Sequence, residues 1–327
     1  MSQVAPEVAG PLQAEAEVEA GVAVAGRSPR QLFWIRFRQD KVAFVGLGFL
    51  VVLALLAITA PLISKYIAHH GPNELFQRQM TDEFGLPKGP NSDFWFGADS
   101  VGRDAFVRVL YGARTSLLVA FVATGIAVGI GVTLGMIAGY FRGAVDTVIA
   151  RTIDIILSMP LLLFAIGIVA TCSTSKEGCL GGTVEPGTKV VIFVIALFTW
   201  PYIARIVRGN TLSIREKEFI EASRSLGASN TRIMFREILP NLVAPITVYT
   251  TLIIPNNILF EAALSFLGLG VPQSTPSWGR MLSDGAQIFE VAWWLMVFPG
   301  VFLLFTTLAF NLFGDGLRDA LDPRTGR

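Results

Sequence analysis

The sequence predicts an all-α integral membrane protein with six transmembrane helices. Of its 327 residues, 52% are hydrophobic and 16% are charged, and the mean hydropathy is +0.57. Soluble chains carry about 25% charged residues, so this composition is typical of a protein in lipid. Six apolar runs are each near the ~20 residues that cross a hydrocarbon core. The predicted spans are 42–63, 117–140, 153–171, 190–206, 242–264 and 291–313.

The N-terminal region divides into a tail and a membrane-entry segment. Residues 1–28 are rich in Ala, Val, Glu and Gly, and this composition cannot bury a core, so we expect a disordered tail. Residues 29–95 then hold an interfacial helix, the first span and a long outer loop. The interfacial helix is indicated by Trp34 and Phe37 interleaved with Arg36 and Arg38, a pattern typical of the headgroup layer. The alternative is a merely solvated entry to the first span.

Small residues and prolines mark individual spans. Glycines recur in the second span with small-xxx-small spacing, which predicts close packing against another helix; they are Gly125, Gly129, Gly131, Gly135 and Gly139. Prolines interrupt the other spans and predict kinks, either as hinges or for packing; they are Pro160, Pro201, Pro245, Pro255 and Pro299.

Basic residues set the expected orientation. Of the 26 Lys and Arg residues, 17 fall on the side of the two termini and 9 on the other side. Six of those 9 lie in the loop 65–115, where six acidic residues balance them. The positive-inside rule therefore predicts that both termini and the loop 213–240 are cytoplasmic.

The loop 213–240 is a charged interruption between two apolar runs, and it predicts helix, turn, helix. Ser213 and Glu216 have capping-box spacing, Gly227 supplies a residue that can end the first helix, and Pro240 is expected to close the second. A loop of this size between spans is rarely a passive connector.

On the first of these helices, Phe219, Ala222 and Leu226 fall on one stripe. Glu221 lies one helical step away, roughly 100° around the axis, and can face a partner.

Two acidic residues inside spans are candidates for the pathway or for gating, because charge in a membrane usually marks function. They are Asp154 near the inner end of the third span and Glu261 near the outer end of the fifth. A structural role at a helix end is the alternative for each. Cys172 and Cys179 flank a short outer loop, where a disulfide could persist.

Catalytic signatures are missing from the sequence. It has no GxxxxGK[ST] phosphate loop, no HExxH and no GxSxG. The net charge of +1 carries no signature of nucleic-acid binding. We therefore predict no catalytic, cofactor-binding or metal site in this chain.

Several segments resemble one family. The loop residues Glu221, Ala222, Ser223, Gly227, Leu239 and Pro240 resemble the cytoplasmic EAA loop of ABC importer permeases, with Ser223 in place of the third Ala. Segments that begin at Phe96, Asp154, Glu261 and Pro276 are similar to the C-type permease of dipeptide, oligopeptide and nickel importers.

This resemblance implies a type I ABC importer permease fold, with a core over 96–314 and a cytoplasmic tail over 315–327. It implies a prokaryotic plasma (inner) membrane, a second related permease, an extracellular binding protein and two cytoplasmic ATPases that bind ATP and Mg. The coupling residues it implies are Phe219, Glu221, Ala222, Ser223, Gly227, Leu239 and Pro240.

The outer side supplies a further hypothesis. We expect an amphipathic outer-surface helix over 96–116 that, with the loop 265–290, gates the outer mouth or receives the binding protein. Its candidate docking residues are Arg103, Asp104, Trp278 and Arg280. The substrate is expected to be a peptide, with a nickel chelate or another chelated solute as the alternative. A self-sufficient secondary carrier would need coupling charges or an inverted repeat, and neither is clear.

Overall fold

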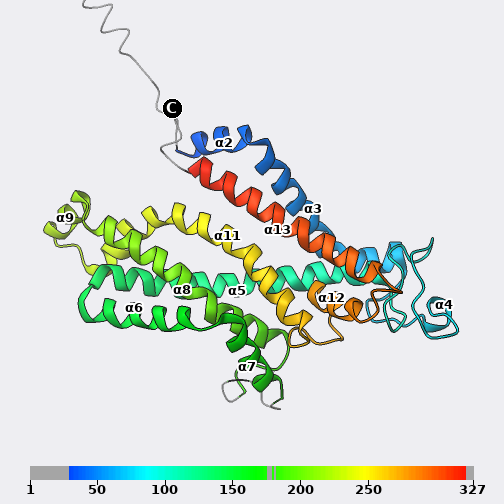
Figure 1. Cartoon of the computed structure of the whole chain (residues 1–327). Coiled ribbons are helices and arrows are strands. Elements are labelled where there is room, and N and C mark those ends of the chain that lie inside the picture. The colour runs from blue at the N-terminus through cyan, green and yellow to red at the C-terminus, as the bar shows by residue number, and fades with distance from the viewer. Residues whose placement is uncertain (1–28, 175–178, 180–181, 322–327) are drawn as a thin grey trace, which may run out of the picture.

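The structure is a computed structural model that describes residues 29–174, 179 and 182–321. These residues fold into helices joined by loops, and the helices form an elongated bundle (Figure 1). The short helix α9 (Glu218–Ser225) lies at one end of the bundle, and α4 (Gln77–Met80) lies at the other. These are called the inner and the outer end below, after the orientation that the positive-inside rule predicts. The all-α membrane fold predicted from composition is confirmed. The predicted N-terminal tail and residues 322–327 of the C-terminal tail lie outside the described residues.

Within the described ranges, five helices are long and apolar enough to cross a membrane, or six segments if a bent pair of helices is counted as one span. The five are α3 (Lys41–Ile63), α5 (Ala105–Phe141), α8 (Thr188–Arg215), α11 (Leu239–Phe266) and α13 (Trp294–Leu321). A π-helical turn, η1 (Ser64–Ala68), extends α3. The helix α11 is preceded without a break by α10 (Asn230–Arg232) and by the π-helical segment η2 (Ile233–Ile238).

The third predicted span, 153–171, is not one continuous helix. It is divided between α6 (Gly143–Ser158) and α7 (Leu161–Thr174), which are bent by 88°. Pro160 has no backbone N–H, and its ring disfavours helical geometry at Met159, which is extended at φ −78° and ψ 137°. The span therefore breaks at one of the prolines that the sequence marks.

The prediction of an amphipathic surface helix over 96–116 is wrong, because the helix here begins only at Ala105. Asp104 caps the N-terminus of α5, because its Oδ1 accepts hydrogen bonds from the N–H groups of Phe106 at 2.8 Å and Val107 at 3.3 Å. Ala105 thus opens a single helix of 37 residues, and the residues before Asp104 form a loop. The first turns of α5 are mostly buried, since α12 (Trp278–Ala286), α13 and the outer loop pack against them.

Close packing of α5 against α8 forms the centre of the bundle (Figure 1). A Cβ atom on Gly135 would lie 2.5 Å from the carbonyl oxygen of Ala204, closer than any side chain can approach. Gly131 and Gly139 face α8 in the same way. The predicted helix interface is confirmed at these three glycines. At Gly125 and Gly129 nothing in the described part of this chain lies within 4 Å of an added Cβ, so the predicted packing is not found there within this chain.

The remaining spans complete the bundle around this pair. The helix α13 packs on both α3 and α11, and a buried cluster joins Leu53, Ile258 and Phe310 across them. At the N-terminal end, α2 (Pro29–Gln39) buries Phe37 against Phe313, with ring centroids 5.9 Å apart. Trp34 of the same helix is exposed, as an interfacial helix requires.

Candidate functional site

The charged loop 213–240 is built differently from the predicted helix, turn, helix. The helix α8 continues to Arg215, so Ser213 lies inside it and caps nothing. Pro240 does not end a helix either. It occupies the first turn of α11, where a missing N–H is tolerated, and directly follows the π-helical η2. The loop is therefore one short helix, α9, between two long ones.

The predicted helix stop at Gly227 is confirmed. Gly227 has a φ of +76°, which only a residue without a side chain adopts at little cost. The N–H of Leu226 donates to the carbonyl of Ala222 at 3.0 Å, and the N–H of Ala228 donates to that of Ser223 at 3.1 Å. These bonds satisfy the last carbonyls of α9. Residues 216–229, with α9 at their centre, are called the α9 loop below.

Ile220 anchors the α9 loop to the bundle. Its side chain is fully buried in a cluster with Ile233, Ile238 and Leu242. The stripe of Phe219, Ala222 and Leu226 instead faces outward, and Leu226 is 89% exposed. Ile220 could not be recognised from the sequence, because α9 has apolar residues on two sides and periodicity alone does not tell which side is buried.

Polar contacts tie the α9 loop to the inner ends of α5 and α8. The Tyr140 hydroxyl donates to Oδ1 of Asn230 at 2.8 Å. The guanidinium groups of Arg215 and Arg224 lie 5.8 and 6.0 Å from the centre of the Tyr140 ring, a cation–π arrangement. Arg142 forms an ion pair with Glu216. These contacts join the α9 loop and its flanking residues Arg215 and Asn230 to Tyr140 and Arg142 at the end of α5.

Asp154 lies on α6 in an ion pair with Arg205 of α8, with Nη2 and Oδ1 2.7 Å apart. Both side chains are more than half exposed. Nearby, Arg208 Nη2 donates to Asp146 Oδ2 at 2.8 Å and joins the same two helices. Asp154 therefore belongs to a bridge between α6 and α8.

Glu261 lies near the outer end of its span, as predicted, but its side chain is fully buried and does not reach water. Its Oε2 accepts a hydrogen bond from Ser116 at 2.8 Å, and its Oε1 accepts one from Ser265 at 2.7 Å. Ser116 lies on α5, and Glu261 lies on α11. Glu261 thus joins two spanning helices at their outer ends.

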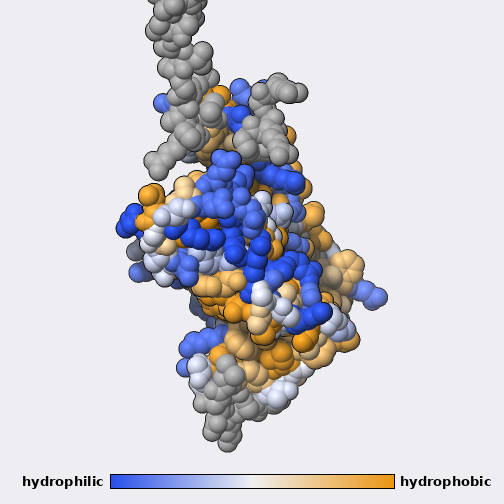
Figure 2. Space-filling view, turned by 90° about the vertical axis from the view of Figure 1, so that its left-hand side faces the viewer, coloured by the Kyte–Doolittle hydropathy of each residue, from blue (hydrophilic) through white to orange (hydrophobic). Residues whose placement is uncertain are grey.

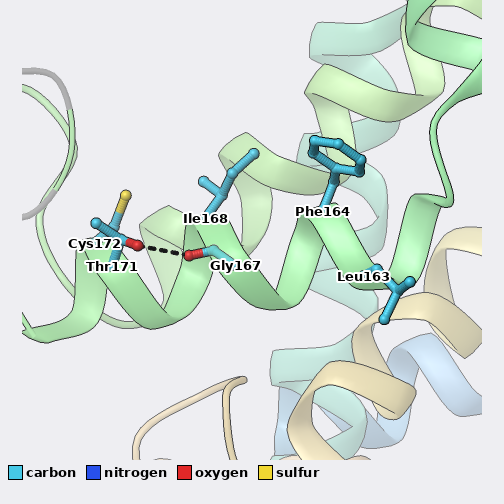
Figure 3. Close-up of a pocket in the computed structure, with 6 residues that line it drawn as sticks. All are labelled: Leu163, Phe164, Gly167, Ile168, Thr171 and Cys172. Carbon is cyan, nitrogen blue, oxygen red and sulfur yellow. Dashed lines mark hydrogen bonds between the residues drawn. The ribbon is translucent and has the colours of Figure 1, made fainter.

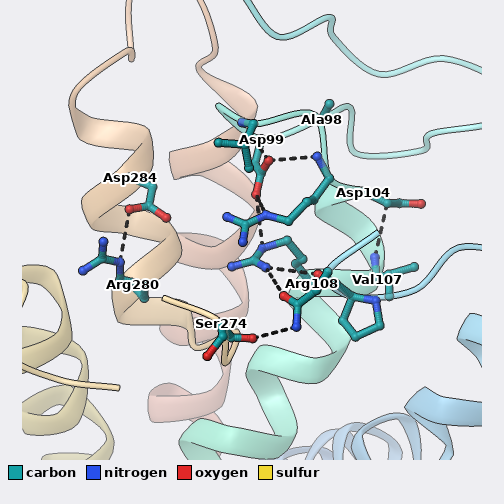
Figure 4. A network of polar contacts seen from close by, with 12 residues as sticks. Ala98, Asp99, Asp104, Val107, Arg108, Ser274, Arg280 and Asp284 are labelled. Atoms are coloured by element: carbon teal, nitrogen blue, oxygen red, sulfur yellow. Dashed lines mark hydrogen bonds and ion pairs between the residues drawn. The ribbon is translucent and has the colours of Figure 1, made fainter. Parts of the chain in front are cut away.

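A buried ion network lies at the outer end of the bundle (Figure 4). Asp99 Oδ2 accepts from Arg103 Nε at 2.7 Å and lies 3.3 Å from Arg108 Nε. All three side chains are less than 10% exposed. Arg108 Nη1 also donates to the carbonyl of Pro72 at 3.1 Å, which fastens the loop 65–104 to α5. Arg108 was expected on the surface of the amphipathic outer helix together with Arg103, whereas Asp99, the partner of both, was not predicted.

The predicted outer docking residues are mostly interior. Trp278 is fully buried, and its Nε1 donates to the carbonyl of Val109 at 3.1 Å. Asp104 is 1% exposed and lies 2.7 Å from His70 Nδ1. Arg280 pairs with Asp284 at 3.2 Å, and burial raises the pKa of that carboxyl group. Their surroundings are occupied by this chain, so these side chains shape the outer end of the bundle and do not present a free surface.

Two features lie around α7. Cys172 and Cys179 form a disulfide across the short outer loop. A shallow hollow of 530 Å³ follows one face of α7 and is lined by Leu163, Phe164, Gly167, Ile168, Thr171 and Cys172 (Figure 3). The side-chain hydroxyl of Thr171, which lines this hollow, donates to the Gly167 carbonyl of the same helix at 2.8 Å. An apolar hollow on a single helix suits lipid or a neighbouring helix.

Two models of known protein families match this chain. The model of the family described as "Binding-protein-dependent transport system inner membrane component" matches residues 131–327. The model described as "N-terminal TM domain of oligopeptide transport permease C" matches residues 28–80. The chain belongs to the family of binding-protein-dependent transport permeases.

Individual relatives agree with this assignment. The chain is 42% identical over 298 residues to the dipeptide transport system permease protein DppC of Alkalihalophilus pseudofirmus, covering 91% of this chain and 90% of that one. It is 41% identical over 298 residues to the glutathione transport system permease protein GsiD of Escherichia coli O6:K15:H31, covering 91% of each.

Among solved structures, an inward-facing MetNI methionine ABC transporter has a similar fold. The TM-score is 0.54 at 19% identity, over 66% of this chain and 96% of that one. The resemblance drawn from the sequence motifs is thus confirmed. The protein is a multi-pass permease subunit of an ABC importer of the cell membrane, and a self-sufficient carrier is not favoured.

Proposed function

We propose that this permease forms half of the translocation pathway of an ATP-driven importer and that the α9 loop is its coupling surface. The observation that carries the proposal is the division of α9 into a buried and an exposed side. Ile220 is anchored in the core, while Phe219 is 41% and Leu226 is 89% exposed. An apolar stripe on a helix in water is a surface for a protein partner.

The position of α9 supports this role. The helix projects from one end of the bundle (Figure 1), and hydrophilic residues gather across the middle of that end (Figure 2). Charge counting assigns this end and both termini to the cytoplasm. A partner pressing on α9 would displace the Ile220 cluster and the contacts of Tyr140, and through them α5, α8 and α11.

The partners are proposed on the same grounds. Two cytoplasmic ATPases would bind and hydrolyse ATP with Mg, and one of them would receive the α9 loop, so this chain itself would not be an enzyme. A related second permease would complete the pathway over the core 96–314, and an extracellular binding protein would deliver the solute. Glu221, Ala222, Ser223 and Gly227 would form the contact, while Leu239 and Pro240 would hold the entry into α11.

Peptides are the proposed substrate class, since relatives more than 40% identical are permeases for a dipeptide and for glutathione. A nickel chelate or another chelated solute is the alternative within the family. Asp154 and Glu261 are proposed to hold helix pairs together during gating, because each joins two spanning helices.

The proposal is tested by the paired substitution Phe219→Ala, Leu226→Glu in the reconstituted transporter. Because both side chains are exposed, we expect normal amounts of the permease in the membrane. We expect ATP hydrolysis stimulated by the binding protein to fall at least tenfold. Gln39→Glu, an exposed position on α2, serves as the control. If the rate of ATP hydrolysis were unchanged in the paired variant, α9 would not be the coupling surface.

A further inference from the structure

A second hollow lies between α7, α8 and α11 and differs in kind from the one along α7. It has a volume of 470 Å³, within the range of small-ligand sites. Its lining includes Tyr202 and Thr199 from α8 and Tyr249, Asn256 and Asn257 from α11. These residues lie well inside their helices, so hydroxyl and amide groups gather at membrane depth.

The hollow is open, and exposed polar groups lie at its mouth among apolar residues such as Phe198 and Phe260. Tyr202 is 52% and Tyr249 is 41% exposed, and Asn256 is also exposed. Within the described part of the chain, neither tyrosine hydroxyl has a hydrogen-bond partner. The Asn256 side chain donates to the carbonyl of Leu252 at 3.0 Å, which leaves its own oxygen available. Polar groups facing hydrocarbon in this way would be costly.

The inner wall is fixed in place. The side chain of Asn257, 4% exposed, donates to Thr124 Oγ1 at 2.8 Å and accepts from Thr199 Oγ1 at 3.0 Å. This chain of bonds joins α5, α8 and α11 behind the hollow. The wall is therefore prearranged, and the exposed amide and hydroxyl groups lie in front of it.

The broken span supports a watery environment at the same place. Leu161, the first residue of α7, lines the hollow just after the 88° bend. Non-helical backbone at membrane depth is tolerated where it is buried in protein or lines a water-filled cavity. Broken helices commonly contribute to solute sites in transporters. By contrast, the outward face of α3 is apolar, with Val45 71% and Val52 55% exposed.

We propose that this hollow is part of the solute path and that Tyr202, Tyr249 and Asn256 exchange hydrogen bonds with the backbone amides of a peptide in transit. This rests on the proposed function. None of the residues that line the hollow is charged. Neutral donors and acceptors match the peptide backbone, which every peptide shares, and they do not select a side chain.

Thiol labelling in the assembled transporter tests whether water reaches the hollow, and it needs no transported solute. We expect the thiols of Tyr202→Cys and Asn256→Cys to react with a water-soluble methanethiosulfonate at least tenfold faster than that of Val52→Cys. The native cysteines are joined in a disulfide and do not interfere. Rates equal to that of Val52→Cys, with and without ATP and vanadate, would overturn the proposal. The proposal would also be overturned if the two thiols reacted in the isolated chain and not in the assembled transporter. The hollow would then be covered by another subunit.

Uptake of trialanine tests the amide contact. We expect Asn256→Leu to lower uptake about tenfold and Asn256→Gln, which keeps the amide, to retain at least half, while Val52→Leu changes nothing. Equal uptake by Asn256→Leu and wild type would refute the contact. If the wild-type transporter takes up no peptide, the proposed substrate class fails, and the labelling rates still decide whether the hollow lies on the path.

Discussion

Asp99→Ala is expected to prevent most of the permease from accumulating in the membrane. The carboxylate of Asp99 lies between the buried guanidinium groups of Arg103 and Arg108. Its other oxygen accepts hydrogen bonds from the N–H groups of Val101 at 3.1 Å and of Arg103 at 2.9 Å. Removing one partner of a buried ion pair costs about 3–5 kcal/mol, because the remaining charge is left uncompensated.

The measurement is the amount of folded chain in detergent extracts and its thermal unfolding temperature. Asp93→Ala is the matched control, since Asp93 lies exposed in the same outer loop. We expect the control to behave as wild type. An Asp99→Ala protein with wild-type abundance and unfolding temperature would show that the network does not hold the outer loop on α5.

Gly135→Leu is expected to separate α5 from α8. An added Cβ would meet the backbone oxygen of Ala204 at 2.5 Å and Val207 Cβ at 2.9 Å, and backbone atoms cannot move aside as a flexible side chain can. Overpacking of this kind costs about 3 kcal/mol. We expect loss of most folded protein and, in any remainder, loss of the contacts that connect α5 to the α9 loop.

Gly129→Leu provides the comparison on the same helix, because nothing lies within 4 Å of its added Cβ in this chain. Folded yield of each variant, measured by fluorescence-detected size exclusion, distinguishes the two positions. Similar yields for both substitutions would contradict the packing that the structure shows. If Gly129→Leu lowered the yield and Gly135→Leu did not, the crowded position would be Gly129, which indicates that a partner chain covers it.

Composition predicted the class of the fold because lipid imposes it, and five of the six predicted apolar runs fall in the five long helices. A chain in a bilayer must bury its backbone polar groups in helices, so apolar runs of sufficient length are readable directly from the sequence. The helix stop at Gly227 was also predictable, since left-handed backbone strongly favours glycine.

Burial of polar side chains was not predictable in the same way. Arg103 and Asp104 read as an exposed charged surface because their partners, Asp99 and His70, are apparent only when the loop folds back on α5. Glu261 likewise reads as an interfacial charge, although Ser116, far away in the sequence, completes its surroundings. Contacts between distant segments, and not local pattern, decide such sites.

The continuity of α11 bears on how a signal could cross the membrane. From η2, beside the α9 loop, the helix runs without a break to Phe266 and carries Glu261 near its outer end. Asn256 and Asn257 lie between these points. A displacement at α9 would therefore reach the proposed solute path and the outer end through one element.

The central claim is that α9 is the surface on which a cytoplasmic ATPase acts, and photo-crosslinking tests it most directly. A benzophenone amino acid replaces Phe219 in the assembled transporter, and the same amino acid replaces Gln39 of α2 as a control. We predict a single adduct with an ATPase subunit from position 219, with a yield that changes between nucleotide-free and ATP-bound states. An ATPase adduct from position 39 and none from position 219 would contradict the claim.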